Sequence, residues 1–260
     1  MNTHAHHVPL SLSFTSPSAW VTELQRRQPT LAAVSQIFLI AALPCMLAAL
    51  IDTRTVNDIS GWIKPTKFFV SLAFYYATLT WFFGYLPAQA QRKAAGRFVI
   101  WASIVAGVLE MVWMVAAAMN GVPAHFNRAD PAWFIAYRIA GLGALTLVLA
   151  ILVQGVLIAR QRDIVLPAAF RLSLVLAAII ATVATLVVAG YMAKTNGHWI
   201  GAIPTDAGGL PLLGWSRNGG DLRVAHFWAL HAHQLLPFTG WIIARSRMRA
   251  AQPLVWMAAF

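Results

Sequence analysis

The sequence predicts an all-helical protein, a polytopic bundle of transmembrane helices, and three observations support this prediction. The chain has 260 residues, of which 59% are hydrophobic and only 10% are charged. A soluble domain normally carries about 25% charged residues, so this chain lacks the polar surface that would face water. In addition, apolar runs of about 20 residues recur along the chain, and a helix of that length crosses roughly 30 Å of hydrocarbon.

Composition and charge also exclude several classes of protein. The high apolar content excludes disorder, the glycines show no collagen-like period, and the single cysteine, Cys45, cannot form a disulfide within the chain. The formal net charge is +11, but Lys and Arg do not cluster on one face or helix of a polar domain, so nucleic acid is not a predicted partner. The predicted surroundings are the lipid bilayer.

The segment before the first apolar run, residues 1–29, is polar and is expected to be a cytoplasmic tail. It lacks the short apolar core and small-residue cleavage site of a signal peptide, so the first helix is expected to be an uncleaved anchor. His4, His6 and His7 form a loose group that could bind a metal, but an unstructured tail is the favoured interpretation.

Residues 30–250 are predicted to form a six-helix transmembrane domain. Strands of an outer-membrane barrel would be shorter and half polar, so helices are favoured. The predicted spans are Thr30 to Ile51, Phe68 to Leu86, Phe98 to Met119, Ala132 to Ala159, Leu172 to Ala193 and Val224 to Ala244. Along the fifth span, Ala177, Ala181, Thr185 and Ala189 recur every four residues and predict a small-residue face for helix packing.

The last ten residues, 251–260, are apolar and allow two interpretations. Ten residues make about 15 Å of helix, which is half a crossing. The segment is either an interfacial tail or the start of a seventh helix.

The positive residues of the loops predict the orientation of the bundle. Eleven Lys and Arg residues fall in the connections on the side of the N-terminus, and seven fall in the connections on the other side. Because cytoplasmic loops carry the excess of Lys and Arg, both ends of the six-helix domain are expected in the cytoplasm. The loops around Lys64, around His125 and from Asn196 to Arg223 then face outward, and binding residues concentrate on loops of this kind.

Ionisable residues within the spans share a depth in the predicted outer half. Glu110 lies about 15 Å below the outer end of its span, Arg138 about 10 Å, and His231 and His233 about 10 to 15 Å. Such residues are costly in lipid and mark a functional site by default. The alternative is an ion pair between Glu110 and Arg138 that only fixes the packing of two helices.

The last span carries the densest group of polar side chains. His226 and His233 are seven residues apart and share one helix face, whereas His231 and Gln234 are three apart and form a second pair. Pro237 frees a backbone carbonyl near His233, so a hydrogen bond within a kinked helix is the favoured interpretation for His233.

These residues are compatible with three chemistries besides a purely structural or partner-binding role. The first is a metal-assisted enzyme or redox protein, with zinc, iron or copper on His125, His226 and His231 and with Glu110 as a ligand or general base. The second is b-type haem, which is less favoured because His125 would be the sole axial partner outside the last span. The third is a proton-coupled transporter or sensor of a small solute, with Glu110 and Arg138 at the binding site and His231 as a proton carrier.

Three stretches of this sequence carry a resemblance to a known family. They are Trp62 to Phe68 (Trp-Ile-Lys-Pro-Thr-Lys-Phe), Glu110 to Asn127, which ends in Ala-His-Phe-Asn, and Gly220 to Pro237, which contains His-x4-His-x2-Gln. They resemble an uncharacterised family of bacterial multipass membrane proteins, in which the second stretch ends in Ser-His-Phe-Asn. The resemblance implies a bacterial inner-membrane location and a seventh helix, but no activity. The site residues that it implies are Lys64, Pro65, Lys67, Glu110, Gly121, His125, Phe126, Asn127, Asp221, Arg223, His226, His231 and Gln234.

Taken together, the sequence predicts one polar site on the outer side. The expected catalytic residues are Glu110, Arg138, Lys64 and Lys67, with Gln234 and Asn127 as cofactor-binding residues and His125, His226 and His231 as metal ligands. The expected partner, besides lipid, is a small or lipid-soluble substrate.

Overall fold

The computed structural model describes residues 6–7, 16–128, 130–201, 203–211 and 213–245, and these residues are mostly helical. The helices are α1 (Pro17–Arg27), α2 (Pro29–Ile51), α3 (Ile63–Phe83), α4 (Ala88–Arg92), α5 (Ala94–Met119), α6 (Pro131–Arg160), α7 (Ala168–Thr195) and α8 (Leu222–Arg245). Three short strand pairs join them: β1 (His6–His7) with β4 (Ile164–Val165), β2 (Thr55–Val56) with β3 (Ile59–Ser60), and β5 (Trp199–Ile200) with β6 (Gly220–Asp221). The predicted all-helical class is confirmed.

Four of the helices in the described part of the chain are long and apolar enough to cross a membrane. They are α2, α5, α6 and α7. Two further long helices, α3 and α8, cover the second and sixth predicted spans but carry more polar side chains, among them Lys64 and Lys67 on α3 and three histidines on α8. Four membrane-compatible helices are therefore found, and crossing by α3 and α8 stays a prediction.

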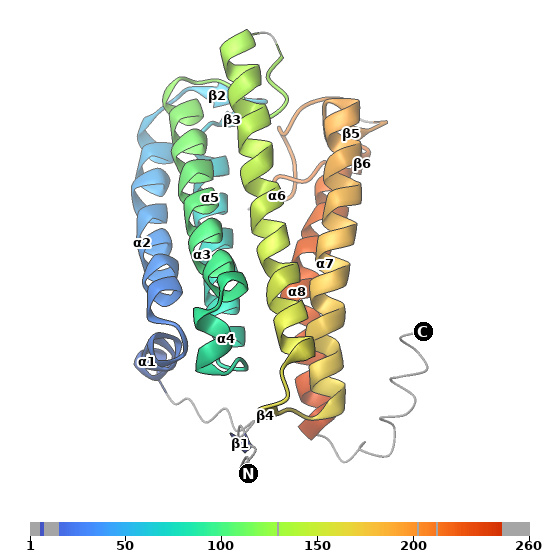
Figure 1. Ribbon diagram of the computed structural model, residues 1–260. Coiled ribbons are helices and arrows are strands. Elements are labelled where there is room, and N and C mark those ends of the chain that lie inside the picture. Colours follow the sequence, from blue (N-terminus) through green and yellow to red (C-terminus); the bar gives the residue numbers. More distant parts are fainter. Residues whose placement is uncertain (1–5, 8–15, 129, 202, 212, 246–260) are drawn as a thin grey trace.

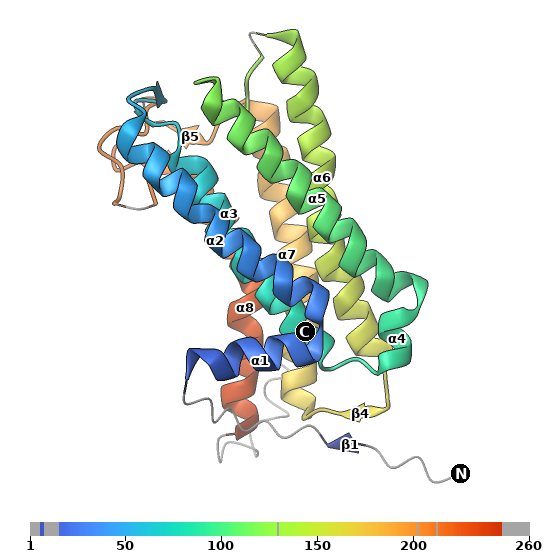
Figure 2. The ribbon, with the colours of Figure 1, turned by 90° about the vertical axis from the view of Figure 1, so that its left-hand side faces the viewer.

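The long helices stand side by side, with loops gathered at two ends (Figures 1 and 2). Helix α7 packs along α8, α2 along α3, and α6 along both α5 and α7. One end holds α1, α4 and the β1–β4 pair, and the opposite end holds β2, β3, β5 and β6. The three loops that the sequence assigns to the outer side therefore meet at one end of the molecule.

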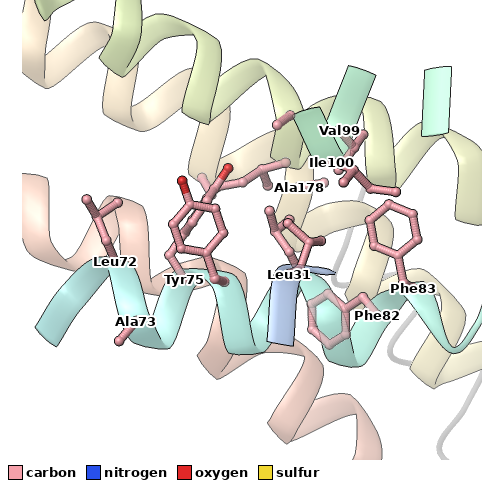
Figure 3. Close-up of a cluster of buried hydrophobic side chains, with 14 of the residues drawn as sticks. Leu31, Leu72, Ala73, Tyr75, Phe82, Phe83, Val99, Ile100 and Ala178 are labelled. Carbon is pink, nitrogen blue, oxygen red and sulfur yellow. The ribbon is translucent and has the colours of Figure 1, made fainter. Parts of the chain in front are cut away.

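The hydrophobic core lies between the helices, and α3 contributes many of its buried side chains (Figure 3). Tyr76, Leu79 and Phe83 of α3 are fully buried, and Leu31 of α2 packs into the same cluster. The outer surfaces of the helices are also apolar; on α2, for example, Leu50 is 83% exposed. A helix that is apolar on both its inner and outer faces is typical of a protein surrounded by lipid.

Small residues bring α6 and α7 close together, as predicted for the fifth span. Ala177, Ala181 and Thr185 of α7 are buried. Next to this face, the hydrogen of Gly155 on α6 points at the Ala178 methyl group of α7 at a distance that leaves no room for a β-carbon. Backbones can approach this closely only where side chains are small.

The N-terminal segment differs from the expected unstructured tail. Ser16 caps α1 by accepting a hydrogen bond from the Ala19 amide (3.3 Å), and Pro17 opens the helix. Glu23 then bonds the next two arginines, Arg26 and Arg27, each at 2.7 Å. Capping and charge pairs three and four residues apart stabilise a helix that hydropathy alone does not reveal. His6 and His7 pair with β4, His4 lies outside the described residues, and so does the predicted tail or seventh helix at 251–260.

Candidate functional site

The loop between α5 and α6 positions His125 at the outer-loop end of the bundle. Ala124 is buried, and its carbonyl accepts a hydrogen bond from Trp113 Nε1 (3.0 Å). Phe126 has a φ of 62°, a left-handed conformation that bulky residues adopt only where the surrounding structure enforces it. This turn sends the rings of His125 and Phe126 to the same aromatic neighbour, Tyr137 of α6, at centroid distances of 5.5 and 5.8 Å.

His125 joins two ionisable residues from two different helices. Its Nδ1 lies 3.0 Å from Nζ of Lys64 on α3, and its Nε2 lies 3.7 Å from Oε1 of Glu110 on α5. Because an ammonium group only donates, we assign the proton of a neutral imidazole to Nε2, the atom that faces the carboxyl group. Lys64, His125 and Glu110 therefore form a polar cluster in which Lys64 is hydrogen-bonded to His125 and the second ring nitrogen of His125 faces the Glu110 carboxyl group.

Glu110 is the innermost member of this cluster. The residue is only 4% exposed, and Oε2 has no hydrogen-bond partner among the described residues. Buried polar atoms are almost always hydrogen-bonded to protein, water or ligand. This oxygen is therefore available to a bound molecule.

The pKa of His125 lies well below its ordinary value of 6.5. Burial is the main cause, and the positive charge of Lys64 and the proximity of His226 lower it further. The ring is therefore neutral at neutral pH, which agrees with its acceptor role toward Lys64.

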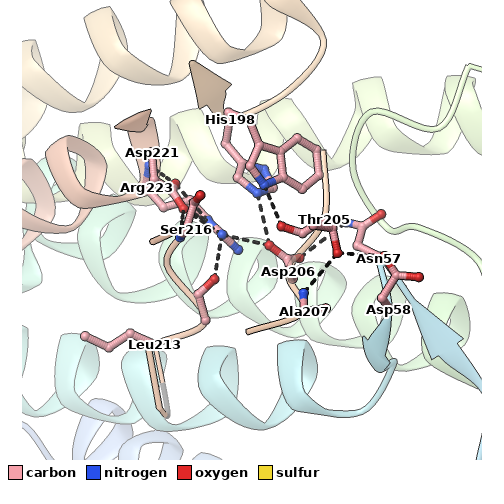
Figure 4. A network of polar contacts seen from close by, with 12 residues as sticks. Asn57, Asp58, His198, Thr205, Asp206, Ala207, Leu213, Ser216, Asp221 and Arg223 are labelled. Atoms are coloured by element: carbon pink, nitrogen blue, oxygen red, sulfur yellow. Dashed lines mark hydrogen bonds and ion pairs between the residues drawn. The ribbon is translucent and has the colours of Figure 1, made fainter. Parts of the chain in front are cut away.

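A second polar cluster covers this end of the bundle and belongs to the loop between α7 and α8 (Figure 4). Arg223 Nη2 lies 2.7 Å from Asp206 Oδ1 and 2.7 Å from Asp221 Oδ2, and it donates a further hydrogen bond to the Gly214 carbonyl (2.7 Å). His198 approaches the same Asp206 oxygen at 3.4 Å. One guanidinium thus ties three separate parts of the loop together.

This loop is also fastened to the hairpin between α2 and α3 (Figure 4). Asn57 Nδ2 donates to Asp206 Oδ2 (3.4 Å), and Thr205 Oγ1 donates to Asp58 Oδ2 (2.7 Å). On α3, Lys67 Nζ donates to the Leu213 carbonyl (3.0 Å). Lys67 therefore holds the loop and makes no hydrogen bond to His125.

The two carboxyl groups of the cluster have lowered pKa values. Burial alone would raise the pKa of Asp206, but its hydrogen bond to His198 and the charge of Arg223 outweigh burial. Burial would likewise raise the pKa of Asp221, but the hydrogen bond from Arg223 more than offsets this effect and lowers the pKa. Both groups are charged at neutral pH and stabilise the loop in that form.

The structure separates several residues that the sequence places in one site. Arg138 is exposed on α6, and within the described residues it forms no ion pair with Glu110. The alternative interpretation of an ion pair between Glu110 and Arg138 is therefore not supported, because depth along a helix does not fix the rotation of the helix about its axis. Asn127 is partly exposed, and its side chain makes no hydrogen bond to the described part of the chain.

The residues of α8 divide between two levels. His226 is close enough to His125 to affect its pKa, and His226 Nδ1 is buried without a hydrogen-bond partner in the described part of the chain. Further down, His231 packs on Phe227 with ring centroids 4.0 Å apart, and Gln234 donates to Thr78 Oγ1 of α3 (3.3 Å). His226 is therefore coupled electrostatically to His125, whereas Gln234 bonds α3.

These placements do not fit a transition metal. Among the residues that the structure describes, no three His, Cys, Asp or Glu side chains are grouped as a metal would require. Both ring nitrogens of His125 already face other groups, Lys64 and Glu110. A metal on His125, His226 and His231 stays a prediction from sequence, and we derive no chemistry from it or from haem.

Three polar residues near the site, two of them buried, escape the sequence reasoning. Tyr137 contacts His125, while Tyr75 and Gln154 are buried deeper, between α3 and α6. Gln154 could have been found, because an amide in the middle of a long apolar span is unusual. The tyrosines give no such signal, since aromatic residues are common throughout this sequence.

No family model matches this chain, and no similar protein is found among the curated proteins or the solved structures compared with it. The resemblance to a bacterial multipass family therefore stays an expectation.

Proposed function

We propose that this chain is a multipass membrane protein that binds a small solute together with a proton, as a proton-coupled transporter or sensor does. In this proposal α3 and α8 cross the membrane with α2, α5, α6 and α7, the N-terminus is cytoplasmic, and the bilayer is the bacterial inner membrane. Lys64, His125 and Glu110 form the binding site, on the outer side.

One observation carries the proposal: the buried carboxyl group of Glu110 has one oxygen near His125 and the other without a hydrogen-bond partner among the described residues. A carboxyl group buried in an apolar bundle is costly to ionise, so it can exchange a proton only where a neighbouring dipole or positive charge stabilises its charged form. His125 is such a neighbour, because its Nε2 faces Glu110 Oε1. The ammonium group of Lys64 lies 3.0 Å from the other ring nitrogen of His125, Nδ1.

The surroundings of the site favour a small solute with hydrogen-bonding groups. Glu110 Oε2 and His226 Nδ1 are both buried without hydrogen-bond partners in the described part of the chain. Aromatic rings, those of Phe68 and Tyr137, stand beside His125 at 6.1 and 5.5 Å. Few polar groups among apolar walls are typical of a small-molecule site.

The chain allows a selective test, because Glu110 and Glu23 are its only glutamates. The full chain, labelled with ¹³C at the glutamate carboxyl carbon and reconstituted in lipid, should give two carboxyl NMR signals. A panel of small carboxylates, amines, amino acids and sugars is screened for thermal stabilisation of the protein. Any solute that stabilises the protein should shift the Glu110 signal and acidify or alkalise the vesicle interior, which an enclosed pH dye reports.

Matched variants separate the site from the rest of the protein. Glu110→Gln should abolish both solute binding and the pH change, whereas Glu23→Gln, which changes the same side chain on α1, should retain both. The proposal is refuted if Glu110→Gln folds and binds the solute with the same proton uptake as the unaltered chain.

A further inference from the structure

A row of polar groups continues inward from Glu110 along one face of α6. Glu110 Oε2 lies beside Gly143, where an added β-carbon would be 3.9 Å from that oxygen. One turn further, the Leu147 carbonyl accepts a hydrogen bond from the Tyr75 hydroxyl (2.8 Å). Two turns beyond lies Gln154, which is 1% exposed. Positions 143, 147 and 154 share one helix face and cover about 16 Å of its length.

The facing side of the row is built by α3. Tyr75 supplies the hydroxyl, and the Leu79 carbonyl accepts a hydrogen bond from Gln154 Nε2 (2.9 Å). The Phe82 ring then stands edge-on to His233 of α8, with centroids 5.1 Å apart. Positions 75, 79 and 82 again share one helix face, and Figure 3 shows Tyr75 and Phe82 in the same buried cluster.

Gln154 and His233 lie at the same depth in the bundle. The contacts that α6 and α8 each make with α7 show this without reference to α3. Gly155 of α6 packs directly on Ala178 of α7, and Gly240 of α8 packs on Ser173 of α7. Helices α7 and α8 run in opposite directions, so a step of seven residues back from Gly240 along α8 matches a step of seven residues forward from Ser173 along α7. The first step reaches His233, and the second reaches the turn around Ala178. Gln154 and His233 therefore lie at the level of the same turn of α7.

Each of these two side chains has a buried atom without a hydrogen-bond partner in the described part of the chain: Oε1 of Gln154 and Nδ1 of His233. His233 is 2% exposed. The intrahelical hydrogen bond that Pro237 suggests for His233 is not made by this nitrogen. Two unpartnered polar atoms at one depth, in a region with small neighbours such as Gly155, are the setting in which proteins hold buried water.

We propose that Gln154 and His233 bind water halfway through the bundle and form, with the Tyr75 hydroxyl, an inner proton station below Glu110. Water donates to Gln154 Oε1 and exchanges a hydrogen bond with His233, so that a proton leaving Glu110 meets further polar groups on its way toward the opposite side. The water site stands on the geometry of α3, α6, α7 and α8. Its use as a route rests on the proposed function of Glu110.

The water site is tested with water itself as the probe. The full chain, labelled with ¹⁵N in its histidine rings and reconstituted in lipid, is studied by NMR with magnetisation transfer from water, and the His233 signal is assigned by its loss in His233→Gln. If His233→Gln does not fold, His233→Asn serves for the assignment. We expect transfer to His233 at least threefold stronger than in Gln154→Leu, and unchanged transfer in Gln36→Leu, which removes an amide from α2. Absence of transfer to His233 in the unaltered chain would overturn the inference.

The route is tested separately from solute binding. Tyr75→Phe removes one hydroxyl and should slow the vesicle pH change at least tenfold while the Glu110 carboxyl signal still responds to the solute. A full pH change in Tyr75→Phe and His233→Gln would overturn the route. Loss of solute binding in Glu110→Gln tests the proposed function alone, since that variant keeps the water transfer to His233.

Discussion

Replacing Arg223 with alanine removes the guanidinium group that faces two buried carboxylates. The side chains of Asp206 and Asp221 are 6% and 2% exposed, and that of Arg223 is 23% exposed. Removing one partner of a fully buried ion pair costs about 3–5 kcal/mol. Because water reaches part of the guanidinium, we expect about 2–3 kcal/mol for Arg223→Ala.

The assay is hydrogen exchange of the loop between α7 and α8, which reports local opening directly. Two amides are suitable: that of Leu222, bonded to the His198 carbonyl (2.8 Å), and that of Ser216, bonded to Asp221 (2.9 Å). A loss of 2–3 kcal/mol in the free energy of opening corresponds to about 30- to 150-fold faster exchange. Amides in the middle of α5 should exchange as before.

The matched control is Arg217→Ala, which removes the same charge from an exposed position in the same loop. Exchange in this variant should stay within about twofold of the unaltered chain, since an exposed charge contributes little. If Arg223→Ala exchanges no faster than Arg217→Ala, the three-way ion pair does not hold the loop and the reasoning is refuted.

The same pair predicts a dependence on pH. The folded-state pKa values of Asp206 and Asp221 lie below their ordinary value of 3.8, so their contribution to stability is complete above that value and is lost as pH falls through the folded-state pKa. Slow exchange of the loop amides, corrected for intrinsic rates, should therefore persist at neutral pH and disappear only in strong acid. Loss of protection already near neutral pH would contradict this assignment.

Two further predictions concern packing and His125. Gly107→Ala would place a β-carbon against the Tyr76 hydroxyl and should lower the free energy of unfolding by about 1–3 kcal/mol. The assay is thermal stability in detergent. The control is Gly141→Ala, whose added β-carbon would meet nothing within 4 Å and which should change the stability little. Because the pKa of His125 is lowered, protonation of its ring opposes folding: the ring leaves stability independent of pH above its ordinary pKa of 6.5, and stability falls as pH drops below that value, by at most about 1.4 kcal/mol per pH unit. His125→Gln should make the thermal stability less steep between about pH 7 and pH 5, and an unchanged slope would contradict the assignment.

The helical class and the long helices are readable from the sequence, because hydropathy over about 20 residues is a local property. The same property misses α1, whose stability comes from a cap and charge pairs around Glu23. Hydropathy also predicts six apolar spans. In the described part of the chain only α2, α5, α6 and α7 are apolar enough to cross a membrane by length and composition, because α3 and α8 hold more polar side chains.

Some residues of the candidate site can be recognised in the sequence, whereas their contacts cannot. Glu110 and His125 stand out in sequence because ionisable residues are rare in and around apolar spans, and the structure brings them to 3.7 Å. Lys64, also predicted, completes the cluster, whereas Arg138 faces outward. Depth along a helix follows from counting residues, but contact also needs the rotation of each helix.

By itself the sequence determined that this chain is helical, apolar enough for a bilayer and polar at particular depths, because each of these properties depends on residues close together in the chain. Only the tertiary structure decided that His125 lies between Lys64 and Glu110, that Arg223 holds two carboxylates, and that Gln154 and His233 share one level. The physical reason is that these contacts depend on how helices rotate and pack on small residues such as Gly155, and that packing is a property of the whole bundle.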